Sequence, residues 1–252
     1  MVRNLRLVMA ASSLEADPSG FPIRSGMVGV SGAVLRGTPE TDACGLVVDE
    51  AGSVCVFVVK VTGAAARPGL PALAAAAIGV AARAGLPIYE LVGDLRRFAA
   101  SESAANLGLS LLRISTRDSR VEILNAGMPA IIRLLPGEAP TLYQSRSGPV
   151  GNRFAEVYPY ELMSLVWGSA WLLTSDGVTA GSLDPVTLLR GIAGSGLTQS
   201  AHELADAPIA RVEAATLALS AACGETAGDD RTLVVVSADP RRRFQSGIES
   251  RG

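Results

Sequence analysis

Four aspartates and one lysine are the residues of this chain whose types and spacing suggest chemistry. Asp42, Asp176 and the pair Asp229-Asp230 each lie beside an apolar run, and Lys60 is the only lysine in 252 residues. Carboxylates gathered from separate strand ends hold hard divalent cations such as Mg²⁺ and Mn²⁺, which prefer oxygen ligands. Each aspartate taken singly is also typical of a solvated turn. The metal-site hypothesis therefore depends on the fold bringing these residues together.

The segments beside these residues are predicted to be strands. They are the hairpin Leu46–Val48 and Val54–Val59, with a turn at 49–52, and the apolar runs Ala170–Thr174 and Leu233–Val236. Asp42 precedes the hairpin and Lys60 ends its second strand, whereas Asp176 and Asp229-Asp230 flank the two later runs. Side chains at strand ends are able to converge on one site, so this arrangement favours a shared site over isolated turns.

Six segments of the chain together carry a family resemblance. They are Thr41–Gly45, Val59–Ala65, Leu124–Pro129, Ser147–Gly151, Leu173–Thr179 and Asp229–Leu233. In order, spacing and strand context they resemble the metal-dependent PPM, or type 2C-like, serine/threonine protein phosphatases, and most closely the bacterial SpoIIE-like branch. The likeness runs from about Gly26 to Val236. Where branch members read Gly-Asp-Val-Ser-Gly-His-Gly, this chain has Lys60 for the aspartate, and Ala64 and Ala65 for the last two residues.

The resemblance implies a role for each of the charged residues. In this family two Mg²⁺ or Mn²⁺ ions activate the water that attacks phosphoserine or phosphothreonine, so no protein nucleophile is needed. By position, Asp42 resembles the carboxylate shared by both ions, Asp176 and Asp229 resemble ligands of the second ion, and Asp230 is the alternative to Asp229. Lys60 stands where the first ion has its own aspartate. The implied substrate is a phosphorylated regulatory protein of stress or sigma-factor signalling, such as an anti-sigma-factor antagonist.

Lys60 leaves two functions open. A divalent ion about 4 Å from an ammonium is repelled by roughly 8 kcal/mol at an effective dielectric constant near 20, so the two exclude each other. We expect the ammonium to pair with Asp42 in place of the missing cation, leaving one ion or none and an impaired phosphatase. The alternative function is a pseudophosphatase that regulates a partner by binding it. A lysine that only extends into solvent is the plainer interpretation, and nothing supports a neutral lysine acting as a base.

Bulk properties exclude several other classes of protein. The 48% hydrophobic content suits one large domain, and a net charge of −2 with a pI near 5.5 argues against a nucleic-acid partner. The apolar run Leu5–Ala11 is too short to span a membrane. Cys44, Cys55 and Cys223 lack metal-site spacing and are expected to be reduced, as in a cytoplasmic protein. The single histidine, His202, is expected on a helix surface.

The order of the predicted elements gives the fold class. After the hairpin we expect helices near 68–84 and 87–100, strands near 107–115, 120–124, 130–135, 141–144, 155–159 and 170–174, helices near 184–192 and 199–221, and a last strand. This pattern suits two packed sheets flanked by helices. The resemblance sharpens it to an α/β (α+β) four-layer α-β-β-α sandwich with two mostly antiparallel sheets. We expect an N-terminal arm (1–22), a PPM-type phosphatase domain (23–239) and a basic, solvated tail (240–252).

Overall fold

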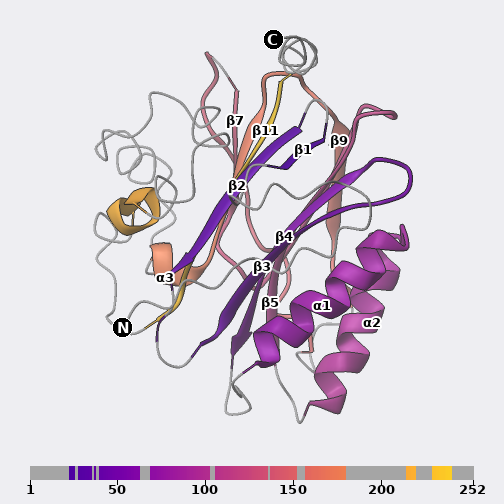
Figure 1. Cartoon of the computed structure of the whole chain (residues 1–252), viewed down its shortest axis with the longest axis vertical. Helices are drawn as coiled ribbons and strands as arrows, with labels where there is room; N and C mark the ends of the chain where they lie inside the picture. Colours follow the sequence, from indigo (N-terminus) through magenta and orange to yellow (C-terminus); the bar gives the residue numbers. More distant parts are fainter. Residues whose placement is uncertain are drawn as a thin grey trace, which may run out of the picture.

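Two stacked β-sheets with helices on their outer faces make up the protein (Figure 1). The computed structural model describes residues 23–25, 28–35, 37, 40–62, 69–102, 106–135, 137–151, 157–179, 214–219 and 229–239. All the strand pairs within these ranges are antiparallel. The predicted four-layer α-β-β-α arrangement is therefore confirmed.

The five-stranded sheet has the order β3-β4-β5-β6-β9. Its strands are β3 (Asp42–Val48), β4 (Val54–Thr62), β5 (Asn106–Ser115), β6 (Arg120–Ala126) and β9 (Tyr160–Ser164). The hairpin of β3 and β4 closes through a turn in which the Asp49 carboxylate accepts a hydrogen bond from the Ser53 amide at 2.8 Å. Helices α1 (Leu70–Arg83) and α2 (Ile88–Ser101) cover the outer face of this sheet.

The six-stranded sheet has the order β1-β2-β11-β10-β7-β8. Its strands are β1 (Ile23–Ser25), β2 (Val28–Leu35), β11 (Arg231–Ala238), β10 (Ala170–Thr174), β7 (Ile131–Leu134) and β8 (Thr141–Tyr143). Strand β2 pairs with β11 along its whole length, from Val28 opposite Ala238 to Leu35 opposite Arg231. The short helix α3 (Asp176–Thr179) and helical residues 214–219, orange in Figure 1, lie against the outer face.

Three apolar clusters hold these layers together. Phe57, which is 2% exposed, belongs to the cluster between the five-stranded sheet and its two helices. Trp171, which is 1% exposed, belongs to the cluster between the two sheets. Leu219 and its neighbours form the third cluster on the outer face of the six-stranded sheet. Burial of apolar surface on both faces of each sheet explains why β4 and β11 read as nearly continuous apolar runs rather than alternating ones.

Several predicted elements differ from the structure. Strand β4 continues two residues beyond Lys60, and β2 was not predicted because Gly29 and Gly32 interrupt its apolar run. The strand expected near 155–159 is wrong, since residues 157–159 are not in a strand and β9 begins at Tyr160. Strand β9 lies at a sheet edge and alternates exposed and half-buried residues, a weak signal in the sequence.

Some expectations fall outside the part of the chain that the structure describes. These are the N-terminal arm, the basic tail, His202, Cys223, the helix near 184–192 and most of the helix near 199–221. Cys44 and Cys55 are buried and take part in no disulfide within the described residues. Burial raises the pKa of the Cys55 thiol to about 11, which keeps it protonated and unreactive.

Candidate functional site

Asp42 and Lys60 are brought together by the hairpin of β3 and β4. Asp42 is the first residue of β3, and the register of the pair places it directly opposite Lys60 on β4. The Asp42 residue is fully buried, and Lys60 is only 6% exposed. Lys60 therefore does not extend into solvent, which excludes the plainer interpretation of this lysine.

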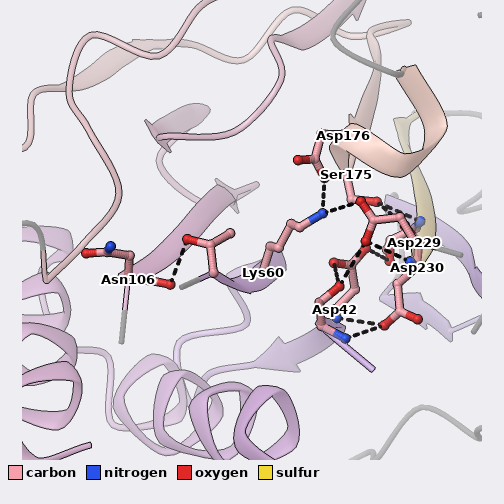
Figure 2. Close-up of polar contacts among 10 residues, drawn as sticks. Asp42, Lys60, Asn106, Ser175, Asp176, Asp229 and Asp230 are labelled. Atoms are coloured by element: carbon pink, nitrogen blue, oxygen red, sulfur yellow. Dashed lines mark hydrogen bonds and ion pairs between the residues drawn. The ribbon is translucent and has the colours of Figure 1, made fainter. Parts of the chain in front are cut away.

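The Lys60 ammonium joins two of the predicted metal ligands. Its Nζ donates hydrogen bonds to Asp176 Oδ1 and, at 2.7 Å, to Asp229 Oδ2. Figure 2 shows the lysine side chain directed at these two carboxylates from β4. Burial is the largest single influence and would lower the pKa of Lys60. The hydrogen bonds to the two aspartates, together with the nearby negative charges of Asp42 and Asp176, outweigh it and raise that pKa above the usual value. Lys60 is consequently a fixed cation.

The expected partner of Lys60 was wrong. Within the described part of the chain the ammonium pairs with Asp176 and Asp229 instead of with Asp42. Asp42 contributes to raising the pKa of Lys60 through its nearby charge. Its carboxylate instead accepts a hydrogen bond from the Thr232 hydroxyl at 3.0 Å and has the Thr41 hydroxyl 3.2 Å away.

Burial dominates the electrostatics of Asp42. It raises the pKa of this carboxyl to about 7, against the lowering effects of the Ser175 hydrogen bond and the Lys60 charge. The Ser175 hydroxyl in turn accepts a hydrogen bond from the Thr232 amide at 2.9 Å. Thr41, Ser175 and Thr232 are thus supporting residues to which the sequence analysis gave no role, although all three lie inside or beside the motifs it singled out.

Asp176 reaches the site because its neighbour has no side chain. Asp176 begins α3 two residues after β10 ends, and its side chain is 50% exposed. A Cβ atom added at Gly177 would lie 1.9 Å from the carbonyl oxygen of Asp230, which no side chain tolerates. Glycine at this position lets the start of α3 pack directly on the backbone that carries Asp229 and Asp230.

The Asp230 carboxylate accepts hydrogen bonds from backbone amides. Asp230 is fully buried, and the amides are those of Gly37, Thr41 and Asp42, the last two at 2.8 Å each. Asp229, by contrast, is partly exposed and faces Lys60. Of the two candidates for one metal-ligand position, the geometry therefore favours Asp229. The hydrogen bonds of Asp230 connect the start of β3 to the start of β11.

The residues present do not fit a pair of divalent ions while Lys60 is charged. In the described ranges no three carboxylate, histidine or cysteine side chains are arranged to hold a metal ion. An ion bound to Asp229 Oδ2 at about 2.1 Å would lie no more than about 4.8 Å from Nζ, given the 2.7 Å ion pair. The ammonium occupies the space in which a cation would join Asp176 to Asp229.

The other two motifs of the family resemblance shape turns outside this cluster. The Asn125 side-chain amide donates to the carbonyl oxygens of Pro129 at 2.8 Å and Tyr143 at 3.0 Å, and so fixes the passage from β6 to β7. Val150, in the segment 147–151, exchanges two backbone hydrogen bonds of 2.8 Å with Leu107. Both motifs thus contribute hydrogen bonds that hold the turns of this part of the fold.

No helix within the described ranges is long and apolar enough to cross a membrane.

Comparisons with known proteins agree with this fold. The model of the family described as Stage II sporulation protein E (SpoIIE) matches residues 50–239. No curated protein sequence matches the chain significantly.

Solved structures with the same fold share little sequence with the chain. The RsbU and RsbW domains of Rv1364c from Mycobacterium tuberculosis superpose with a TM-score of 0.60 at 19% identity, over 85% of this chain and 61% of that one. The PP2C phosphatase domain of SpoIIE from Bacillus subtilis, solved with a fragment of its regulatory domain, gives 0.63 at 16% identity, over 83% and 63%. RsbX in complex with magnesium gives 0.61 at 13% identity, over 87% and 99%. The chain thus spans less than two thirds of the first two structures.

Proposed function

The chain belongs to the SpoIIE family of PP2C-like phosphatase domains, and from this premise we propose that it regulates a signalling protein by binding it, with its metal-dependent phosphatase site closed by Lys60. One observation carries the proposal: the Lys60 ammonium is ion-paired with both Asp176 and Asp229. These are the carboxylates that a metal ion would otherwise join. A protonated lysine supplies positive charge there, but it cannot act as the Lewis acid that the family chemistry requires.

The partner we propose is a regulatory protein that carries phosphoserine or phosphothreonine, such as an anti-sigma-factor antagonist. The structural similarity to RsbU and RsbW domains and to a protein of the bacterial stressosome supports a partner of this kind. We place this activity in the cytoplasm, where buried thiols such as those of Cys44 and Cys55 stay reduced.

A slow phosphatase is the second candidate, and one observation favours it. Asp42, Asp176 and Asp229 lie together around Lys60, and the Asp176 side chain is half exposed. If Lys60 moved aside, these three carboxylates would be the ligands of Mg²⁺ or Mn²⁺. Asp230 would not be a ligand, because its carboxylate is already bonded to backbone amides. RsbX, whose structure contains magnesium, supports this choice of ion.

Phosphate release from a phosphoserine peptide distinguishes the two candidates. We expect no release by the wild type across a series of Mg²⁺ and Mn²⁺ concentrations, and measurable release by Lys60→Asp. The control is Lys60→Asp combined with Asp176→Asn, which should be inactive because a ligand is missing again. Equal, metal-dependent release of phosphate by the wild type and Lys60→Asp would show that Lys60 does not close the site, and the slow phosphatase would then be the better proposal.

A further inference from the structure

Strand β9 leaves one edge of the five-stranded sheet open. It pairs with β6 on one side, and no other described strand pairs with it on the other side. The Leu165 amide donates to the Ser119 carbonyl oxygen at 2.7 Å, in the register of the β6–β9 pair. Because successive residues of a strand direct their backbone groups to opposite sides, the amides and carbonyls of Tyr160, Leu162 and Ser164 point away from β6. They form a row of donors and acceptors along the open edge.

Apolar side chains are concentrated at this edge. Of the eight large apolar side chains that are exposed within the described ranges, four lie in residues 157–166. They are Val157, Tyr160, Leu162 and Val166, and their exposed fractions run from 42% to 74%. Tyr160 and Leu162 are two residues apart and therefore lie on the same face of β9, which carries no charged side chain. An open edge with apolar side chains and no charge on one face favours pairing with a further strand.

The opposite face of β9 is turned toward the six-stranded sheet. Glu161 and Met163 lie on this face, and Met163 packs against the apolar cluster between the two sheets. The Glu161 carboxylate pairs with the Arg146 guanidinium at 3.0 Å. A hollow opens here between β8 and β9, with Tyr143, Arg146, Pro159 and Glu161 in its lining. A strand added at the open edge would direct every second side chain toward this side.

Arg133, beside Met163, has no carboxylate partner among the described residues. Its guanidinium lies 3.9 Å from Met163 Sδ and 3.4 Å from the Thr141 hydroxyl, and its buried Nε makes no hydrogen bond with the described part of the chain. A partly buried guanidinium without an anion is costly. Because Glu161 is already paired with Arg146, it does not supply that anion. The edge is therefore suited to a carboxylate from outside the chain.

We propose that β9 binds an extended segment of a partner protein as an additional antiparallel strand. An acidic residue of the segment lies opposite Met163, and apolar residues lie opposite Leu162 and Tyr160. In this mode of recognition, backbone hydrogen bonds supply affinity and alternate side chains supply specificity. Residues directly opposite each other in antiparallel strands have Cβ atoms about 5 Å apart. A glutamate opposite Met163 consequently reaches the Arg133 guanidinium that Met163 contacts.

A second copy of β9 fits this edge less well than a foreign segment. A two-fold axis at Leu162 would set Glu161 of each copy opposite Met163 of the other, but that carboxylate is already paired with its own Arg146. The two Glu161 side chains would also lie diagonally opposite each other on one face, with Cα atoms about 7 Å apart. Repulsion between like charges therefore disfavours this pairing.

This inference rests on the proposed role of the chain as a regulator that binds a signalling protein, and it names where that protein is held. It does not rest on closure of the phosphatase site, because β5 and β6 separate β9 from the strand that carries Lys60. Peptide binding at β9 is measured without metal ions or phosphate. Its failure is therefore distinguishable from a failure of the Lys60→Asp experiment.

Fluorescence anisotropy of two labelled peptides, titrated with the full chain, tests the acidic position. The probe is Ser-Thr-Glu-Val-Thr-Val-Ser, which sets Glu opposite Met163 and its two Val residues opposite Leu162 and Tyr160; the control peptide has Lys in place of Glu. We expect the wild type to bind the probe about tenfold or more tighter than the control peptide. Arg133→Met should bind the two peptides equally. No binding of the probe up to about 1 mM of the wild type, or an unchanged preference in Arg133→Met, overturns the proposal.

Variants of β9 test the open edge itself. Leu162→Pro removes an amide that points away from β6, a position at which an edge strand tolerates proline, and it should abolish probe binding. Leu162→Lys, which keeps the backbone amide, should weaken binding about tenfold or more. The matched control is Leu217→Lys, at a residue 49% exposed on helical residues 214–219, and it should bind like the wild type.

Two outcomes of the variant series contradict the proposal. Equal effects of Leu162→Lys and Leu217→Lys would show that the probe binds elsewhere, and this comparison decides the matter even if Leu162→Pro fails to fold. Sedimentation velocity detects the other occupant of the edge. If the wild type self-associates and Leu162→Lys abolishes that association, a second copy occupies β9 and the proposed partner segment is wrong.

Discussion

Replacing Lys60 with methionine should allow Asp42, Asp176 and Asp229 to bind a cation. Methionine has a similar shape but no charge, so the change removes the ammonium from between Asp176 and Asp229. An ion on Asp229 would lie at most about 4.8 Å from Nζ, from the 2.7 Å ion pair and a metal–oxygen distance of about 2.1 Å. At an effective dielectric constant near 20, a charge of two and a charge of one repel by roughly 7 kcal/mol at that distance.

Solvent reduces this repulsion at the actual site. The Asp176 and Asp229 side chains are 50% and 31% exposed, so water screens part of the interaction. If about a third of the repulsion survives, Mn²⁺ binds Lys60→Met roughly 50-fold more tightly than it binds the wild type. Lys60→Asp should bind still more tightly, because it replaces the cation with a further ligand.

Isothermal titration calorimetry with Mn²⁺ measures this difference directly. Lys60→Arg is the matched control, since it keeps a positive charge at the same position and should bind as weakly as the wild type. If the wild type binds Mn²⁺ with the same affinity and stoichiometry as Lys60→Met, the ammonium does not occupy the cation's place and the reasoning is refuted. Tight binding by Lys60→Arg would show that side-chain volume matters more than charge.

Three further predictions concern the scaffold of the site. Asp230→Ala leaves three backbone amides without their carboxylate acceptor, so urea unfolding should show a loss of about 3 kcal/mol or more; Asp230→Asn, which keeps one acceptor oxygen, should lose less. Burial raises the pKa of Asp42 from 3.8 to about 7, so the folded state holds a proton that the unfolded chain releases. The resulting stability is complete below about pH 4 and is lost as the pH rises through about 7, by a few kcal/mol in all; unfolding curves for Asp42→Asn, which cannot titrate, should lack this dependence. Gly177→Ala should lower the midpoint of thermal unfolding, because its Cβ would lie 1.9 Å from a backbone oxygen, whereas Gly79→Ala within α1, with its nearest contact at 3.7 Å, should be neutral or stabilising. Equal midpoints for the two glycine variants would contradict the close contact.

The sequence predicted the elements with strong local signals. The hairpin of β3 and β4 was found because its apolar runs flank the turn formers Asp49 and Gly52, and α2 because its apolar residues repeat at helical spacing. Strand β2 escaped prediction because its glycines leave little apolar pattern, and its place in the sheet depends on pairing with β11. Strength of local pattern, rather than importance to the fold, determined which elements were found.

The structure brings the candidate residues of the site together, but one expected contact differs. Their positions at strand ends and in the family motifs grouped Asp42, Lys60, Asp176 and Asp229, and the structure places them together around the lysine. The pairing of Lys60 with Asp42 was expected because the hairpin sets them opposite each other. A lysine side chain is long enough to reach past its cross-strand neighbour, however, and its actual partners lie more than a hundred residues further along the chain. Which carboxylates pair with Lys60 therefore depends on the tertiary structure, which the local sequence does not show.

The pairing of β2 with β11 has a consequence for how the protein folds. The two strands lie roughly 200 residues apart in the sequence, yet they are neighbours near the middle of one sheet. Closing so long a loop is slow. Asp229 directly precedes β11, so neither the pairing of β2 with β11 nor the ion pair of Lys60 with Asp229 forms until residues 229–238 have left the ribosome. During synthesis the hairpin of β3 and β4 and helices α1 and α2 are able to assemble first. Until β11 is made, the edge of β2 that pairs with it stays unpaired. That interval is when the chain is most exposed to aggregation.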